Sequence, residues 1–125
     1  MIAKIVAVGA LLMAFAIAAG AFGAHALKDR LDEYSKGVYD KAAFYHLTHA
    51  MAILIVGLVA TNKLISEYAA EKIFLIFLAG IAIFSGSLYV LALSGVRWLG
   101  AITPIGGTLF IIGWIYLAYS AYLNR

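Results

Sequence analysis

The stretch from Ile73 to Val96, IFLIFLAGIAIFSGSLYVLALSGV, is 24 residues long and has no charged side chain; Lys72 and Arg97 bracket it. A helix needs about 20 mostly apolar residues to cross a hydrocarbon core of roughly 30 Å. Backbone polar groups in lipid must be satisfied within the segment, so this stretch predicts a membrane-spanning helix. It is apolar throughout instead of alternating, which disfavours a barrel strand.

Three further uncharged runs divide the rest of the chain. Their bounding residues are Lys4 and Lys28 (23 residues between them), Lys41 and Lys63 (21), and Arg97 and Arg125 (27). The sequence therefore predicts an all-α fold, a four-helix transmembrane bundle that forms a single integral membrane domain over residues 1–125. We expect the spans near residues 3–27, 42–61, 72–95 and 98–123.

The composition agrees with a membrane protein. Hydrophobic residues make up 66% of the chain, charged residues make up 12%, and the mean hydropathy is +1.02. Soluble domains are usually about half apolar and about a quarter charged, so a disordered tail, an ordinary soluble enzyme domain and a coiled coil are excluded. No basic cluster is interleaved with exposed aromatics, and we expect no nucleic-acid partner. The absence of cysteine excludes disulfides and Cys-ligated metals.

The expected location is a membrane crossed several times, the inner or plasma membrane if the source is bacterial. Lys4 and the Ala24-His25-Ala26 stretch resemble a secretory signal peptide. The apolar run is longer than the about 7–15 residues of such signals, so we expect the span to be retained. Lysine and arginine number four on the side of the termini and five on the other, which leaves the orientation open.

The connections differ in length. The first, from Lys28 to Lys41, carries apolar residues at helical spacing between charged ones: Leu27, Leu31, Tyr34 and Val38. This pattern predicts a short amphipathic interfacial helix between spans one and two, either a docking or lipid-sensing element or a connector that packs on its own bundle. In the second connection, Ser66 or Thr61 is expected to cap a helix. The third is a tight turn over residues 94–97.

Small residues are expected to hold the helices together, because lipid is as apolar as leucine and close packing must contribute. The candidates are Ala16/Gly20, Ala19/Gly23 and Gly20/Ala24 in the first span, Ala82/Gly86 in the third, and Gly106, Gly107 and Gly113 in the fourth. These faces predict either tight packing within one bundle or a homo-oligomer.

Polar side chains inside the spans are the candidate functional residues, because unpaired polar groups in lipid are costly. The set is His25, His46, His49, Ser85, Ser87, Tyr89 and Thr103. At about 1.5 Å of rise per residue, all of them fall in one leaflet or near the membrane centre. Pro104 removes a backbone donor and can loosen the helix beside Thr103. We therefore predict an intramembrane polar cluster.

Four short stretches also carry a family resemblance: Gly20–Leu27 (GAFGAHAL), His49-Ala50, Phe84–Tyr89 (FSGSLY) and Thr103–Gly107 (TPIGG). In this order they resemble the domain of unknown function 423 family, small membrane proteins that include bacterial inner-membrane members and the eukaryotic transmembrane protein 256. The resemblance runs through all four spans and implies a four-span membrane protein, with no established substrate or reaction. His46 and the alanine-rich first half of the first span lie outside it.

Three functions stay open at this point. We favour a structural or partner-binding bundle, whose polar groups bond helices together and whose partner is a membrane protein or a second copy. The second is binding or transport of a proton, ion or small polar molecule, because imidazole titrates near neutral pH. The third is haem or metal binding by His25, His46 and His49, although no in-span carboxylate completes a usual metal site and we expect no cofactor. No nucleophile-and-base signature is present, so we expect no enzymatic activity.

Overall fold

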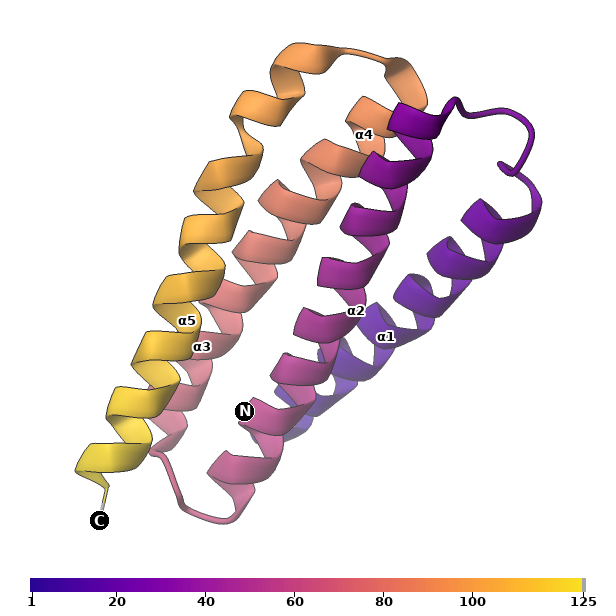
Figure 1. Cartoon of the computed structure of the whole chain (residues 1–125). Helices are drawn as coiled ribbons and strands as arrows, with labels where there is room; N and C mark the ends of the chain where they lie inside the picture. The colour runs from indigo at the N-terminus through magenta and orange to yellow at the C-terminus, as the bar shows by residue number, and fades with distance from the viewer. Residues whose placement is uncertain (125) are drawn as a thin grey trace.

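The computed structural model describes residues 1–124, which are mostly helical and contain no strand (Figure 1). Its elements are α1 (Ile2–His25), α2 (Glu33–Thr61), α3 (Glu67–Gly80), the π-helical turn η1 (Ile81–Ser85), α4 (Gly86–Ser94), the 3₁₀ turn η2 (Arg97–Ala101) and α5 (Thr103–Leu123). Four helical segments are long and apolar enough to cross a membrane: Ile2–His25, Glu33–Thr61, Glu67–Ser94 and Arg97–Leu123. The prediction of an all-α bundle with four spans is confirmed.

The separate interfacial helix predicted between the first two spans is wrong. Residues 26–32 form turns, and the polar segment from Glu33 to Lys41 is the beginning of α2. Nothing in this segment breaks the helix, so its hydrogen bonds continue into the span. Tyr39 anchors it, because its ring is buried with Leu27 and its hydroxyl donates to the Ala19 carbonyl at 2.5 Å.

Asp32 begins α2 as its N-cap. Its carboxylate accepts the backbone N–H of Ser35 at 2.7 Å, which satisfies one of the donors left free in the first turn. This hydrogen bond holds the pKa of Asp32 below the ordinary range of an aspartate, with a smaller contribution from Arg97. The carboxylate therefore stabilises the first turn fully above the ordinary aspartate pKa, and the stabilisation is lost as pH falls through the lowered pKa.

We expect the protection factor of the Ser35 amide, which is its intrinsic exchange rate divided by its observed rate, to be high at neutral pH and to fall as the solution is acidified through the lowered pKa of Asp32. Asp32→Asn should keep the protection factor high at every pH, because asparagine caps a helix as well as aspartate does. NMR exchange rates of both proteins in micelles, corrected for intrinsic exchange, measure this. An identical pH profile of the protection factor in the Asn variant would contradict the assignment.

The remaining two connections are short. Ser66 caps α3, since its hydroxyl accepts the Ala69 N–H at 3.1 Å, which settles the choice between Ser66 and Thr61. Gly95 ends α4 with φ of 73°, a left-handed conformation that favours glycine. Because both turns are tight, successive spans run antiparallel (Figure 1).

The helices form an open arrangement. α1 packs on α2, α2 packs on α3 and α4, and α5 packs on α3 and η1 (Figure 1). α1 and α5 therefore take the outer positions. Within the most apolar windows, only 17% of residues are buried in the first span and 22% in the last, against 44% in each middle span. The outer helices present most of their surface to lipid.

Glycines bring the helices close, but not at every predicted pair. A Cβ on Gly57 would lie 2.8 Å from Val6 of α1, and one on Gly106 would lie 2.8 Å from the Cα of Phe84. The predicted Gly20 pairs are wrong, because Gly20 is exposed and a Cβ there would meet nothing within 4 Å. A Cβ on Gly86, which was predicted to pair with Ala82, would likewise meet nothing within 4 Å.

The π turn η1 divides the third span into two halves that pack against different helices. A π turn accommodates one extra residue inside a helix. α3 before it lies mainly against α5, whereas α4 after it lies mainly against α2. At the junction, the buried Ser85 hydroxyl donates to the Ala42 carbonyl of α2 at 2.8 Å.

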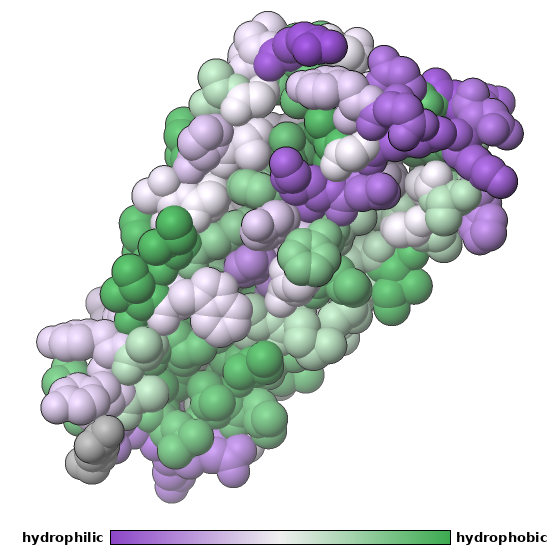
Figure 2. All heavy atoms as spheres, viewed as in Figure 1, coloured by the Kyte–Doolittle hydropathy of each residue, from purple (hydrophilic) through white to green (hydrophobic). Residues whose placement is uncertain are grey.

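Hydrophilic residues gather at the two ends of the molecule (Figure 2). The richer end carries the connection between α1 and α2, and the surface between the ends is mostly apolar or neutral (Figures 1 and 2). This distribution is typical of a membrane protein whose middle part lies in the hydrocarbon core and whose two ends lie at the membrane surfaces.

Candidate functional site

The predicted polar residues form separate interhelical pairs instead of one connected cluster. Ser85 bonds to α2 as described above. The Ser87 and Thr103 hydroxyl oxygens lie 2.7 Å apart and join α4 to α5. The Ser87 hydroxyl also donates to the Phe84 carbonyl at 2.9 Å, so both partners are engaged within the protein.

His46 joins α2 to α4. Its Nδ1 lies 3.0 Å from the Tyr89 hydroxyl, whose ring meets that of Tyr39 edge to face at 5.3 Å between centroids. The side chain is buried, and its Nε2 has no hydrogen-bond partner among the described residues. The surroundings of His46 are therefore those of a packed helix junction with one unsatisfied polar atom.

His49 lies deeper and joins α2 to α5. Its Nδ1 is 3.0 Å from the Tyr45 carbonyl, and its Nε2 accepts the indole N–H of Trp114 at 3.1 Å. These partners require the proton on Nδ1 and fix a neutral tautomer. The ring also stacks on Phe110, with 3.6 Å between centroids. Both nitrogens are occupied, so His49 is held rigidly.

Trp114 belongs to the site but not to the predicted polar set, because tryptophan counts as apolar. Its position in the sequence is nevertheless informative. Trp114 lies 17 positions after Arg97 and 11 before Arg125, about 25 Å and 16 Å along a helix, so it is away from both interfaces that tryptophan usually occupies. An indole N–H at such depth needs an acceptor, and His49 supplies it.

His25 does not belong to this set, and its predicted place among the other polar residues is wrong. It is the last residue of α1 and is exposed. A count of depth along the helix predicts that it lies near the headgroups, but such a count cannot tell which way the side chain faces. A haem held between His25 and His49 is not supported, because both nitrogens of His49 are already bonded.

The described residues hold no cluster of metal ligands, and the two interior serines are not paired with a base. No group of three or more His, Cys, Asp or Glu among residues 1–124 could hold a metal ion. The hydroxyls of Ser85 and Ser87 bond to backbone carbonyls and to Thr103, not to a histidine. A hydroxyl nucleophile needs an adjacent base, which neither serine has among these partners.

A groove opens beside His49 on the face between α2 and α5. It has a volume of about 440 Å³, and its lining is mostly aromatic, with small residues of α5: Tyr45, His49, Phe84, Pro104, Gly107, Thr108, Phe110, Ile111 and Trp114. Trp114 is 42% exposed and covers the edge of His49. Of the predicted polar residues, His49 alone lines this groove.

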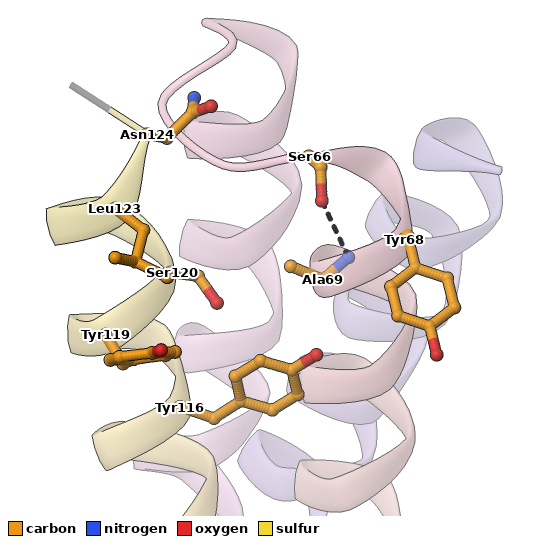
Figure 3. A pocket seen from close by; sticks show the side chains of 8 residues that line it. All are labelled: Ser66, Tyr68, Ala69, Tyr116, Tyr119, Ser120, Leu123 and Asn124. Carbon is orange, nitrogen blue, oxygen red and sulfur yellow. Dashed lines mark hydrogen bonds between the residues drawn. The ribbon is translucent and has the colours of Figure 1, made fainter.

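A smaller pocket of about 290 Å³ lies at the opposite end of the bundle, between α3 and α5 (Figure 3). Tyr68, Tyr116 and Tyr119 line it, and the Ser66 hydroxyl at its edge is already engaged in capping α3. Tyrosines are typical of the membrane interface, and none of the predicted polar residues lies here.

The half of the bundle between these two regions is filled with apolar side chains. Ile53, Val56, Ile73 and Phe77 are fully buried there, together with Ile5 of α1. Interiors packed in this way hold few voids as large as a water molecule. Among residues 1–124, the polar pairs described above therefore do not continue through this apolar part of the bundle.

Comparison with known proteins identifies the family. The family described as protein of unknown function (DUF423) matches residues 19–107. The chain belongs to the DUF423 family. The match begins at residue 19, so the first half of α1 lies outside it, as the sequence resemblance implied.

Similar proteins include several staphylococcal membrane proteins. A UPF0382 membrane protein of Staphylococcus epidermidis (strain ATCC 12228) is 47% identical over 110 residues, 87% of each chain. UPF0382 membrane protein SAB0533 of Staphylococcus aureus is 44% identical over 115 residues, 91% of each chain. A Staphylococcus saprophyticus relative is 41% identical over 91% of this chain and 92% of its own. No solved structure matches. The expected membrane location is confirmed.

Proposed function

We propose that this DUF423 protein is a non-catalytic binding bundle, which offers the groove between α2 and α5 to another component of the membrane. The observation that carries the proposal is the groove itself. It is open to lipid, it is rimmed by aromatic side chains, and a single fixed imidazole lies along it. Ligand sites are commonly apolar concavities with a few well-placed polar groups, and sites in helix bundles lie between helices.

The interior polar pairs act as structural bonds in this proposal. Hydrogen bonds between helices in membranes contribute roughly 0.6–2 kcal/mol each. Three such contacts join α2 to α4, α4 to α5 and α2 to α5, through His46–Tyr89, Ser87–Thr103 and His49–Trp114. They hold the groove walls at a fixed separation. Preorganised walls lower the entropic cost of binding.

Photo-crosslinking from the groove tests the proposal. Ile111 lines the groove and Ile17 lies on α1, and both isoleucines are 61% exposed. A photoreactive side chain at either position should therefore meet ordinary lipid equally often. In native membranes we expect Ile111 to capture one defined species well above the level captured at Ile17. Equal and heterogeneous capture at the two positions would refute the proposal.

A further inference from the structure

The groove beside His49 continues toward the membrane surface. A second hollow of about 440 Å³ adjoins it, and the two share Phe84 and Pro104 in their linings. The second hollow reaches Tyr34 and Lys41, in the first turns of α2. We call these two adjoining hollows the channel; they lie along one side of the bundle and extend from Lys41 in the outer part to Trp114 at the inner end.

The channel is longer than one leaflet. Thr103 lines its outer part and Trp114 its inner end. Eleven residues separate them along α5, which is about 16 Å at 1.5 Å per residue. Counted from Arg97 beside the opening, Trp114 is 17 residues or about 25 Å along the chain, so the inner end lies past the middle of a hydrocarbon core of roughly 30 Å.

Side chains of α2 and α5 meet beneath the channel, through the 3.1 Å His49–Trp114 hydrogen bond and the 3.6 Å stack of His49 on Phe110. Gly100 and Gly107 contribute no side chain to the wall, which leaves room along α5 for an extended acyl chain.

The outer end of the channel is positively charged. Lys41 is exposed, lines the hollow and makes no ion pair with any described residue. The Arg97 guanidinium lies 4.3 Å from the centroid of the Tyr34 ring, beside the same opening. Asp32 attracts Arg97 and partly offsets its charge, so Lys41 is the uncompensated cation. Basic groups at the cleft between spans attract anionic headgroups.

We propose that this channel binds one anionic phospholipid, with its phosphate beside Lys41 and Arg97 and one acyl chain lying over Phe84 and Pro104 to end at Trp114. The inference rests on the proposed function and names the component that the groove holds. A zwitterionic phospholipid fills the channel equally well but gains less at the outer end, because its headgroup carries no net charge. Selectivity between the two therefore depends on Lys41.

Fluorescence quenching by brominated lipid tests this assignment. The chain has two tryptophans, so Trp98→Phe leaves Trp114 as the reporter at the inner end. The protein is placed in phosphatidylcholine vesicles that contain a minor, equal fraction of either brominated phosphatidylglycerol or brominated phosphatidylcholine. We expect Trp114 to be quenched as if the local share of the anionic lipid were about fivefold its bulk share, the effect of one lysine near the headgroups.

Charge variants make the result specific. Lys41→Gln should reduce quenching by the anionic lipid to the level of the zwitterionic one, and Lys41→Arg should preserve the excess. Lys28→Gln is the matched control, because Lys28 lies at the same end of the bundle but lines a different hollow, beside α1. Equal quenching by both lipids, or an equal loss in Lys28→Gln and Lys41→Gln, would overturn the assignment.

The two proposals fail in different ways. If crosslinking at Ile111 captures a defined protein and quenching shows no headgroup preference, the binding bundle stands and the phospholipid assignment falls. If capture at Ile111 equals that at Ile17 and quenching shows no preference, both fall.

Discussion

Gly106→Ala is expected to lower the free energy of unfolding by about 3 kcal/mol, the upper end of the usual cost of overpacking. A Cβ at this position would lie 2.7 Å from the Cβ of Phe84 and 2.8 Å from its Cα. These atoms belong to the backbone and root of a neighbouring helix, so no side-chain rotation relieves the clash. α5 must move away from η1, which also separates Ser87 from Thr103. Titration with denaturing detergent in micelles measures the loss.

Gly107→Ala is the matched control for this variant. A Cβ on Gly107 would lie 3.6 Å from the Phe84 ring, which is ordinary van der Waals contact. Both variants add the same methyl group to adjacent residues of α5, and only one of them faces the backbone. We expect Gly107→Ala to unfold within about 0.5 kcal/mol of the parent. Equal destabilisation by the two variants would show that the close approach of α5 to η1 is not the cause.

His49→Ala should also destabilise the bundle by about 3 kcal/mol. The substitution removes the ring that stacks on Phe110 and leaves the indole N–H of Trp114 without its acceptor. A lost interhelical hydrogen bond costs about 1 kcal/mol, and an unsatisfied donor together with the vacated space costs about 2 kcal/mol more. Detergent unfolding again measures the change in stability.

The emission of Trp114 gives a second, local readout of the same variant. In a Trp98→Phe background, we expect His49→Ala to shift the emission to shorter wavelength, because the indole N–H loses its hydrogen bond in an apolar setting. Met51→Ala serves as the control, since Met51 lies on the same helix and is 49% exposed. It should change neither stability nor emission. An unchanged spectrum in His49→Ala would contradict the hydrogen bond.

The spans could be predicted because the constraint is strict: hydrocarbon admits few charges and requires internal backbone hydrogen bonds. The structure of the first connection could not be predicted, because a separate interfacial helix and a continuous extension of the span have the same amphipathic pattern. The structure shows a continuous helix, which begins at the Asp32 cap and has no break before Ala42. Tyr39 then buries the first turns of α2 against α1.

The predictions for Gly20 and for His25 were wrong for the same reason. Spacing along a helix gives depth, but the direction of a side chain depends on where the neighbouring helices lie. Gly20 and His25 fit their patterns, yet both face away from the bundle. His49 is buried and bonds to Trp114, which lies outside the predicted set because tryptophan counts as apolar and only its indole N–H is polar.

The π turn has a consequence for sequence variation among relatives. Because η1 holds one residue more than an α-helical turn needs, removal of the exposed Ala82 would leave an uninterrupted α-helix with α3 and α4 in nearly their present orientations. Deletion of Leu75, in the regular part of α3, would instead rotate the flanking segments by about 100° relative to each other. A relative that lacks one residue within 81–85 therefore keeps the packing of this span, whereas a relative that lacks one residue elsewhere in the span does not.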